Sequence, residues 1–326
     1  MTRKYLFIIL ISFISLLSAC GSSGGGSDDK VLVSAPGSTV TSSRFHVFGH
    51  SLFTYWGGTP YTNVGDWLGL LAGASGLESV GSHRFGQYAG WNALNWGNPA
   101  SIGFNDLFEQ GNTSPFSGNL TNSNYTHFYT MPSNFLTTDM GGPPYNQPIT
   151  TAQGELETLI DNINSLPSTV EHILYTHWGR AGSYSVSSSN SRPDFTIYNN
   201  AQMGDYLDWH IELQDAVIGG GRPIRMFPVG PIIAWLFENE SYLQSLNFYD
   251  VYGDSAPHGS ENIYLLAALV VYQSIYQASP NLSNFTIPSA ATQIRPEIAN
   301  NLPSIVAAIQ GRLDFHNASG VNVWPD

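Results

Sequence analysis

The sequence predicts an α/β fold in which helices cover both faces of a parallel sheet. Short apolar runs with strand character alternate along the chain with longer runs of helical spacing, the pattern that parallel sheets produce. The chain has 326 residues, of which 42% are apolar and 13% aromatic. A disordered chain is poor in both kinds of residue. We therefore expect a single folded domain from residue 31 to residue 326.

Each expected element follows from local spacing. The expected strands are short apolar runs at residues 45–49, 78–81, 172–176 and 224–229, the last ended by Gly230 and Pro231. The expected helices carry apolar residues three and four apart and cover residues 66–74, 152–166, 206–217, 232–246, 261–277 and 302–313.

Two further segments carry specific expectations. The clearest helix, 261–277, has Ser260 as its expected N-cap and an apolar stripe made by Ile263, Leu266, Ala267, Val270, Val271 and Ile275. Residues 82–150 are rich in Gly, Asn, Pro, Ser and aromatic residues and have no sustained period. This stretch is too long for an ordinary loop, so it is predicted to be an aromatic-rich insertion that carries binding surface.

The charge balance and the absence of certain motifs argue against several classes of partner. The formal net charge is −13, and only 11% of residues are charged. A nucleic acid would be repelled by this field, so no nucleic acid is expected as a partner. The histidines are scattered and there is one cysteine, so no metal site is expected. No glycine-rich phosphate loop or dinucleotide motif is found, and no cofactor is expected.

The N-terminus has the features of a processing signal. Arg3 and Lys4 precede an apolar run at residues 5–17 that is too short to span a bilayer. The run ends in Leu-Ser-Ala-Cys, which resembles the bacterial lipobox and implies a lipid on Cys20. Cys20 read alone is also compatible with a buried apolar residue or a reactive thiol.

Cleavage of this signal defines the expected mature protein. Removal of residues 1–19 takes away two basic residues and no acidic one, which changes the formal charge from −13 to −15. Residues 20–30 then form a lipidated cysteine and a Gly/Ser-rich tether. The lipobox implies a bacterial cell envelope location with the membrane as a partner through the anchor. Gly21 in place of Asp favours the outer membrane in a Gram-negative host.

Two segments carry candidate chemistry. Ser51 lies two residues after the end of the first expected strand, and ligands of parallel sheets bind at the carboxyl ends of strands. A serine in such a turn is usually a cap or turn residue unless a base meets it. His258 is the candidate base, and Asp254, four residues earlier, is placed to orient it. With nine histidines in the chain, an Asp near a His also arises by chance.

The two segments together resemble the GDSL/SGNH hydrolase superfamily. Gly49-His50-Ser51-Leu52 matches the nucleophile turn with His in place of Asp, and the stretch from Asp254 through the following helix resembles the block that carries the base. Phe227-Pro228-Val229-Gly230-Pro231 resembles the strand end that often precedes that block. The resemblance spans residues 45–277. It implies a flavodoxin-like three-layer sandwich with a central parallel sheet, and a serine esterase with Ser51, His258 and Asp254 as its triad.

The resemblance also implies an oxyanion hole, and here the chain departs from the family. Main-chain N–H groups of Ser51 and Gly86 are the implied donors, although Gly86 also suits an ordinary turn. The Gly-x-Asn-Asp block expected after the third strand is missing after residues 172–176, where His177 is the candidate replacement or a structural residue. The Asp-to-His spacing is one residue longer than in the family, so Asp250 stays open as the orienting acid.

These features predict hydrolysis of an acyl ester, with acetyl esters of carbohydrate as the favoured substrate. Four aromatic residues of the 82–150 range offer faces for sugar rings or belong to the core: Trp91, Trp96, Tyr125 and Tyr129. Two alternatives stay open. One is an inactive glycan-binding lipoprotein on the same scaffold, and the other is a lipase or lysophospholipase.

Overall fold

The computed structural model describes residues 40–49, 51–55, 59, 61–85, 105–106, 124–131, 149–165, 170–182 and 184–324. All of them belong to one compact unit, residues 34–326. The expected signal at 1–19 and the lipidated tether at 20–30 lie outside the described residues. So do His50 and Gly86.

The described strands form one sheet in the order β3-β2-β1-β4-β5-β6. Their bounds are β1 Ser42–Gly49, β2 Glu78–Phe85, β3 Asn105–Asp106, β4 His127–Thr130, β5 Glu171–Tyr175 and β6 Arg225–Phe227. Five strands run parallel, and the two-residue β3 joins the edge of β2 in the antiparallel direction. The α/β class with a central parallel sheet is therefore confirmed.

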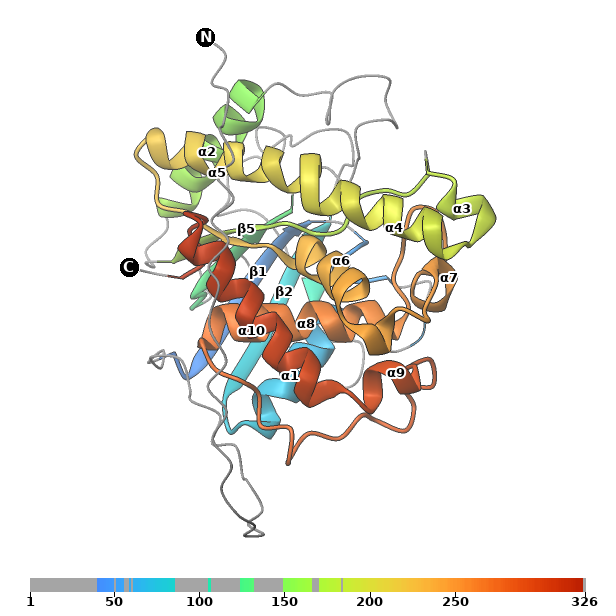
Figure 1. The fold of residues 1–326 in the computed structure, drawn as a ribbon. Helices are drawn as coiled ribbons and strands as arrows, with labels where there is room; N and C mark the ends of the chain where they lie inside the picture. The colour runs from blue at the N-terminus through green and yellow to red at the C-terminus, as the bar shows by residue number, and fades with distance from the viewer. Residues whose placement is uncertain are drawn as a thin grey trace, which may run out of the picture. The chain divides into compact units, whose positions relative to one another are not determined.

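Helices cover both faces of this sheet (Figure 1). On one side α2 (Ile149–Asn164) packs against α5 (Leu207–Gly219). On the other side α1 (Val64–Ala74) packs against α8 (Glu261–Tyr276), and α10 (Leu302–Ala318) lies over α8. The remaining helical segments are α3 Val186–Ser189, α4 Arg192–Ala201, a π-helical turn at Gln202–Tyr206, α6 Val229–Asn239, a 3-10 turn at Ser241–Leu243, α7 Phe248–Val251 and α9 Pro296–Ala299.

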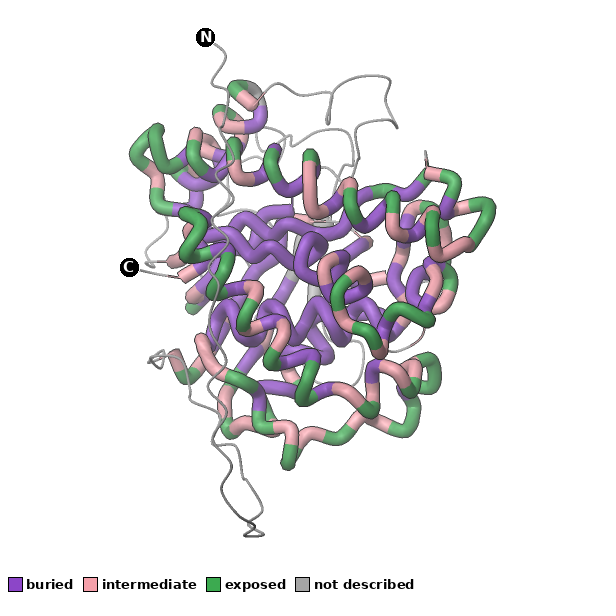
Figure 2. The backbone as a smooth tube through the Cα atoms, viewed as in Figure 1, coloured by how far each residue is buried: buried purple, intermediate pink, exposed green. Residues whose placement is uncertain are grey.

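The core lies between the layers, and burial is deepest in the sheet and in α8 (Figure 2). Every residue of α8 is buried, because this helix contacts α1, α6, α10 and β6. The predicted apolar stripe of 261–277 is therefore only part of the contact surface, and the helix is enclosed on all sides. Ser260 does precede the helix as predicted, but its side chain makes no capping hydrogen bond.

Most of the expected strands and helices are found within a few residues of their predicted bounds, and three expectations need correction. The helix expected at 232–246 ends at Asn239, because Glu240 is extended, and a 3-10 turn at Ser241–Leu243 follows it. The 82–150 range is not only an insertion, because it contains β4, which pairs with both β1 and β5. This strand has only four residues, so its periodicity is too short to detect. Gly230 and Pro231 do not end a strand; they lie in the first turn of α6, where a proline needs no N–H partner.

None of the described helices combines the length and apolar character that a bilayer crossing requires.

Candidate active site

Ser51 lies at the carboxyl end of the sheet, just beyond β1. The strand is central in the sheet and mostly buried. Its last residue is Gly49, and a side chain there would place its Cβ 2.5 Å from the sulfur of Met131, so there is little room for one. The main-chain carbonyl of Ser51 accepts a hydrogen bond from the Tyr264 hydroxyl of α8 at 3.0 Å. The nucleophile candidate is thus fixed between the sheet and the helix that follows His258.

A chain of two hydrogen bonds joins Ser51, His258 and Asp254. Ser51 Oγ is 2.8 Å from His258 Nε2, across 207 residues of sequence. His258 Nδ1 is 2.6 Å from Asp254 Oδ2. The His258 side chain is 18% exposed, so part of it reaches solvent.

The hydrogen-bond partners of Asp254 and His258 define which of their atoms carry a proton. Burial disfavours the charged form of Asp254, but hydrogen bonds from the ring and main chain of His258 and from the Ala256 N–H outweigh it, so the pKa of Asp254 is lowered. An ionised carboxylate only accepts, so Nδ1 of His258 carries the hydrogen and donates it. Nε2 is then free to accept the Ser51 hydroxyl proton, the arrangement that a general base requires.

Main-chain contacts hold the His258 loop in place. Asp254 Oδ1 accepts the N–H groups of Ala256 and His258, each at 2.9 Å, which explains how a spacing of four residues brings the carboxylate to the ring. The Gly253 N–H donates to the His258 carbonyl at 2.7 Å and closes the loop. From the segment after β5, the indole N–H of Trp178 donates to the Pro257 carbonyl at 2.8 Å.

Asp250 is engaged elsewhere. Its carboxylate accepts the Asn247 N–H at 2.8 Å and caps α7, and its other oxygen lies 3.7 Å from the Arg295 guanidinium. Of the two aspartates, the structure brings Asp254 to His258.

His177 occupies a buried position with hydrogen-bond partners of its own. Its side chain is fully buried, and Nδ1 lies 2.7 Å from the Trp178 carbonyl and 3.0 Å from the Tyr206 hydroxyl. These contacts favour the structural interpretation of His177 over the oxyanion donor.

The strand order changes where the amide-bearing block is expected. The resemblance drawn from the sequence implies that block after the third strand, and the third parallel strand along the chain is β4, not β5. The sequence after β4 reads Met131-Pro132-Ser133-Asn134, with Asn134 four residues beyond the strand. Asn134, like Gly86, lies outside the described residues.

Two of the candidate sugar-binding aromatics belong to the core. Tyr125 is 3% exposed and its hydroxyl lies 2.6 Å from Ser82 Oγ, while Tyr129 is fully buried and stacks on Phe45. Trp91 and Trp96 lie outside the described residues.

Sequence reasoning missed one aromatic residue at the site. The ring of Tyr55 stacks on the His258 imidazole with centroids 4.0 Å apart and planes 11° apart. Tyr55 lies in the loop that follows Ser51, and a loop aromatic gives no periodic signal by which sequence alone finds such a contact.

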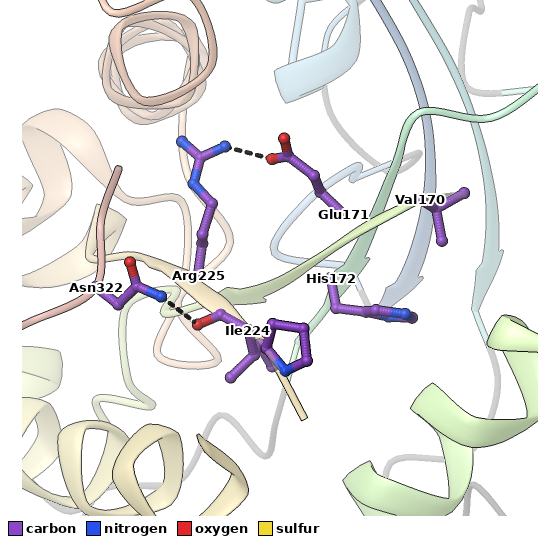
Figure 3. A pocket seen from close by; sticks show the side chains of 7 residues that line it. Val170, Glu171, His172, Ile224, Arg225 and Asn322 are labelled. Atoms are coloured by element: carbon purple, nitrogen blue, oxygen red, sulfur yellow. Dashed lines mark hydrogen bonds and ion pairs between the residues drawn. The ribbon is translucent and has the colours of Figure 1, made fainter. Parts of the chain in front are cut away.

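A hollow of about 270 Å³ lies at the opposite edge of the sheet, at the amino ends of β5 and β6 (Figure 3). Its polar side chains have hydrogen-bond partners: Arg225 donates to Glu171, the Asn322 amide donates to the Ile224 carbonyl, and His172 Nε2 lies 3.0 Å from Asn164 Oδ1. Within the described part of the chain, no three His, Cys, Asp or Glu side chains group as metal ligands.

Comparisons of the chain with family models, with curated proteins and with solved structures find no match.

Proposed function

We propose that this protein is a serine esterase of the GDSL/SGNH type that hydrolyses small acyl esters, with acetyl esters of carbohydrate as its substrates. The observation that carries the proposal is the hydrogen-bonded chain from Ser51 through His258 to Asp254 at the carboxyl edge of the sheet. Counted over the parallel strands alone, the strand order is 2-1-3-4-5, that of flavodoxin-like sheets, which agrees with the proposed type.

The geometry supports a two-stage acyl transfer. Ser51 Oγ attacks the ester carbonyl while its proton passes to His258 Nε2, and Asp254 stabilises the imidazolium. The tetrahedral intermediate collapses, the His258 proton leaves with the alcohol, and the acyl group stays on Ser51. Water then attacks the acyl carbonyl with His258 as base, and the carboxylic acid is released.

The decisive experiment compares the purified protein with its Ser51→Ala variant on p-nitrophenyl acetate and on peracetylated cellobiose. We expect hydrolysis by the parent and a loss of at least about 10,000-fold in kcat for the variant, because no other nucleophile is hydrogen-bonded to His258 Nε2 among the described residues. Unfolding midpoints of the two proteins serve as the control for folding.

Other outcomes select the alternatives. If neither protein hydrolyses any ester and both bind the same glycan, the chain is a glycan-binding protein on a hydrolase scaffold. If the parent prefers p-nitrophenyl octanoate to the acetate, it is a lipase or lysophospholipase.

A second prediction concerns the oxyanion hole. Main-chain N–H groups of Ser51 and Gly86 and the side-chain amide of Asn134 are the proposed donors. Asn134→Ala is expected to lower kcat by about 100- to 1,000-fold, because a missing donor leaves the developing oxyanion less stabilised. Asn124→Ala, an exposed asparagine just before β4, is the matched control and should retain activity. Equal rates for both variants would remove Asn134 from the proposed site.

The envelope location is part of the same proposal. Cys20 is proposed to carry the lipid, and the acylated glycan is proposed to be reached at the surface to which the tether holds the domain. Cell fractionation checks this, because Cys20→Ala should move the protein out of the membrane fraction.

A further inference from the structure

The loop after the nucleophile is held against the helix that follows the base. Tyr55 is fixed on both sides of its main chain: its N–H donates to the Thr62 carbonyl at 2.9 Å, and the Thr62 hydroxyl donates to the Tyr55 carbonyl at 2.8 Å. Farther along the loop, the Thr59 hydroxyl donates to the carboxylate of Glu261 at 2.5 Å. Glu261 is fully buried in the first turn of α8, three residues after His258.

This anchoring places the Tyr55 ring flat against the imidazole. The two rings are nearly parallel, at 11°, with centroids 4.0 Å apart, which is a face contact rather than an edge contact. The main chain of Tyr55 is held by hydrogen bonds, so its ring is held against one face of the imidazole.

The Tyr55 ring restricts a tilt of the His258 imidazole that the two hydrogen bonds of His258 allow. Asp254 and Ser51 bond the two ring nitrogens of His258 at opposite sides of the imidazole. Rotation of the ring about the line through these two nitrogens changes neither hydrogen-bond length much, so two bonds alone tolerate tilt. A parallel aromatic ring at van der Waals distance resists that tilt on one face.

The same contact acts on charge. When Nε2 takes the proton from Ser51, the imidazole becomes a cation that faces the negative π-face of the Tyr55 ring. The interaction is stronger for the imidazolium than for the neutral ring, so it favours the state formed during attack over the ground state.

We propose that Tyr55 is a positioning residue for His258, acting through its aromatic ring and not through its hydroxyl. The proposal rests on the proposed esterase function, because it assigns Tyr55 a role in the action of the general base.

Three variants test the role in turnover: Tyr55→Phe, Tyr55→Leu and, as the matched control, Tyr61→Leu in the same loop, whose ring packs on Trp67. We expect Tyr55→Phe to stay within about twofold of the parent, since the ring is kept. Tyr55→Leu should lose about tenfold in kcat with little change in KM, because the loss falls on proton transfer and not on substrate binding. Tyr61→Leu should retain the parental kcat.

An activity-independent readout separates this proposal from the proposed function. In protein with ¹³C-labelled histidine, the ring protons of His258 should lie upfield because of the ring current of Tyr55. Tyr55→Phe should keep that shift and Tyr55→Leu should abolish it, with Ser51→Ala as the background that removes turnover.

The outcomes are distinct. If Tyr55→Leu turns over as fast as the parent, or Tyr55→Phe is as slow as Tyr55→Leu, positioning by the ring is overturned. If the His258 resonances do not respond to Tyr55→Leu, the contact itself is overturned. If the parent hydrolyses no ester while the resonances respond as expected, the contact stands, the proposed function fails, and the role in turnover fails with it.

Discussion

At the scale of single residues, the site depends on how Asp254 uses its two carboxylate oxygens. One oxygen accepts the His258 ring N–H, and the other accepts two main-chain N–H groups of its own loop. These bonds outweigh the partial burial of the group and lower its pKa, so Asp254 stays charged at neutral pH and holds one tautomer of His258.

Asp254→Asn is therefore expected to lower kcat by about 1,000- to 10,000-fold, because an amide can donate to Nδ1 and so favour the wrong tautomer of His258. The measurement is p-nitrophenyl acetate hydrolysis at neutral pH.

Asp250→Asn is the matched control for this prediction. An amide oxygen at position 250 still accepts the Asn247 N–H, and the long, partly exposed contact with Arg295 contributes little. We expect activity within about twofold of the parent. A slow Asp250→Asn together with an active Asp254→Asn would reverse the assignment of the orienting acid.

At the scale of elements, the site is braced by the contact between the first turn of α6 and the segment after β5. The Gly230 N–H donates to the Thr176 carbonyl at 2.8 Å. A Cβ at position 230 would lie 2.3 Å from the His177 carbonyl oxygen, so only glycine allows this approach. The displaced backbone would include Trp178, whose indole holds the Pro257 carbonyl next to His258.

Gly230→Ala is expected to lower the free energy of unfolding by about 1–3 kcal/mol, because the methyl group overlaps a main-chain carbonyl. It should also lower kcat, since the shift reaches the His258 loop. Urea unfolding and p-nitrophenyl acetate hydrolysis are the measurements.

Gly73→Ala in α1 is the matched control, because a Cβ there meets no atom within 4 Å. It should raise the free energy of unfolding by about 0.5–1 kcal/mol, the usual gain of Ala over Gly in a helix, and leave kcat unchanged. If Gly230→Ala had the same effects on stability and kcat as Gly73→Ala, the contact between α6 and the segment after β5 would not stabilise the site.

At the scale of the whole molecule, several histidines are buried in their neutral form. Burial lowers the pKa of His127, His172 and His316 to about 4 and that of His210 to about 3. The unfolded chain protonates these groups near pH 6.5, so between about pH 6.5 and pH 4 it binds more protons than the folded protein. Their neutral burial is tolerated above pH 6.5 and becomes destabilising as the pH falls through this window.

We therefore expect the free energy of unfolding to fall steeply from pH 7 to pH 5, by up to about 1.4 kcal/mol per pH unit for each such histidine. Urea unfolding at pH 7, 6 and 5 measures the slope. His172→Asn should reduce this slope by the contribution of one histidine, because one of the titrating groups is removed. Identical midpoints at pH 7 and pH 5 would contradict the prediction.

Local sequence patterns were enough to predict the α/β class. They were also enough to select Ser51, His258 and Asp254 as candidate site residues. Strand and helix periods are short-range properties. Ser51 lies just after a strand that its own sequence identifies, and Asp254 and His258 lie in the loop before the most clearly predicted helix. The same patterns could not detect β4, since four residues give too little periodicity, and without that strand the third block was expected after residues 172–176, at His177.

Tertiary structure decided the remaining questions. The choice of Asp254 over Asp250, the enclosed position of His177 and the stack of Tyr55 on His258 all depend on which loops meet at the sheet edge. That meeting joins residues some 200 positions apart and is set by strand order and close main-chain approaches such as Gly230. Propensity and spacing act over a few residues, so the sequence names the reactive groups, while packing of distant elements fixes their partners.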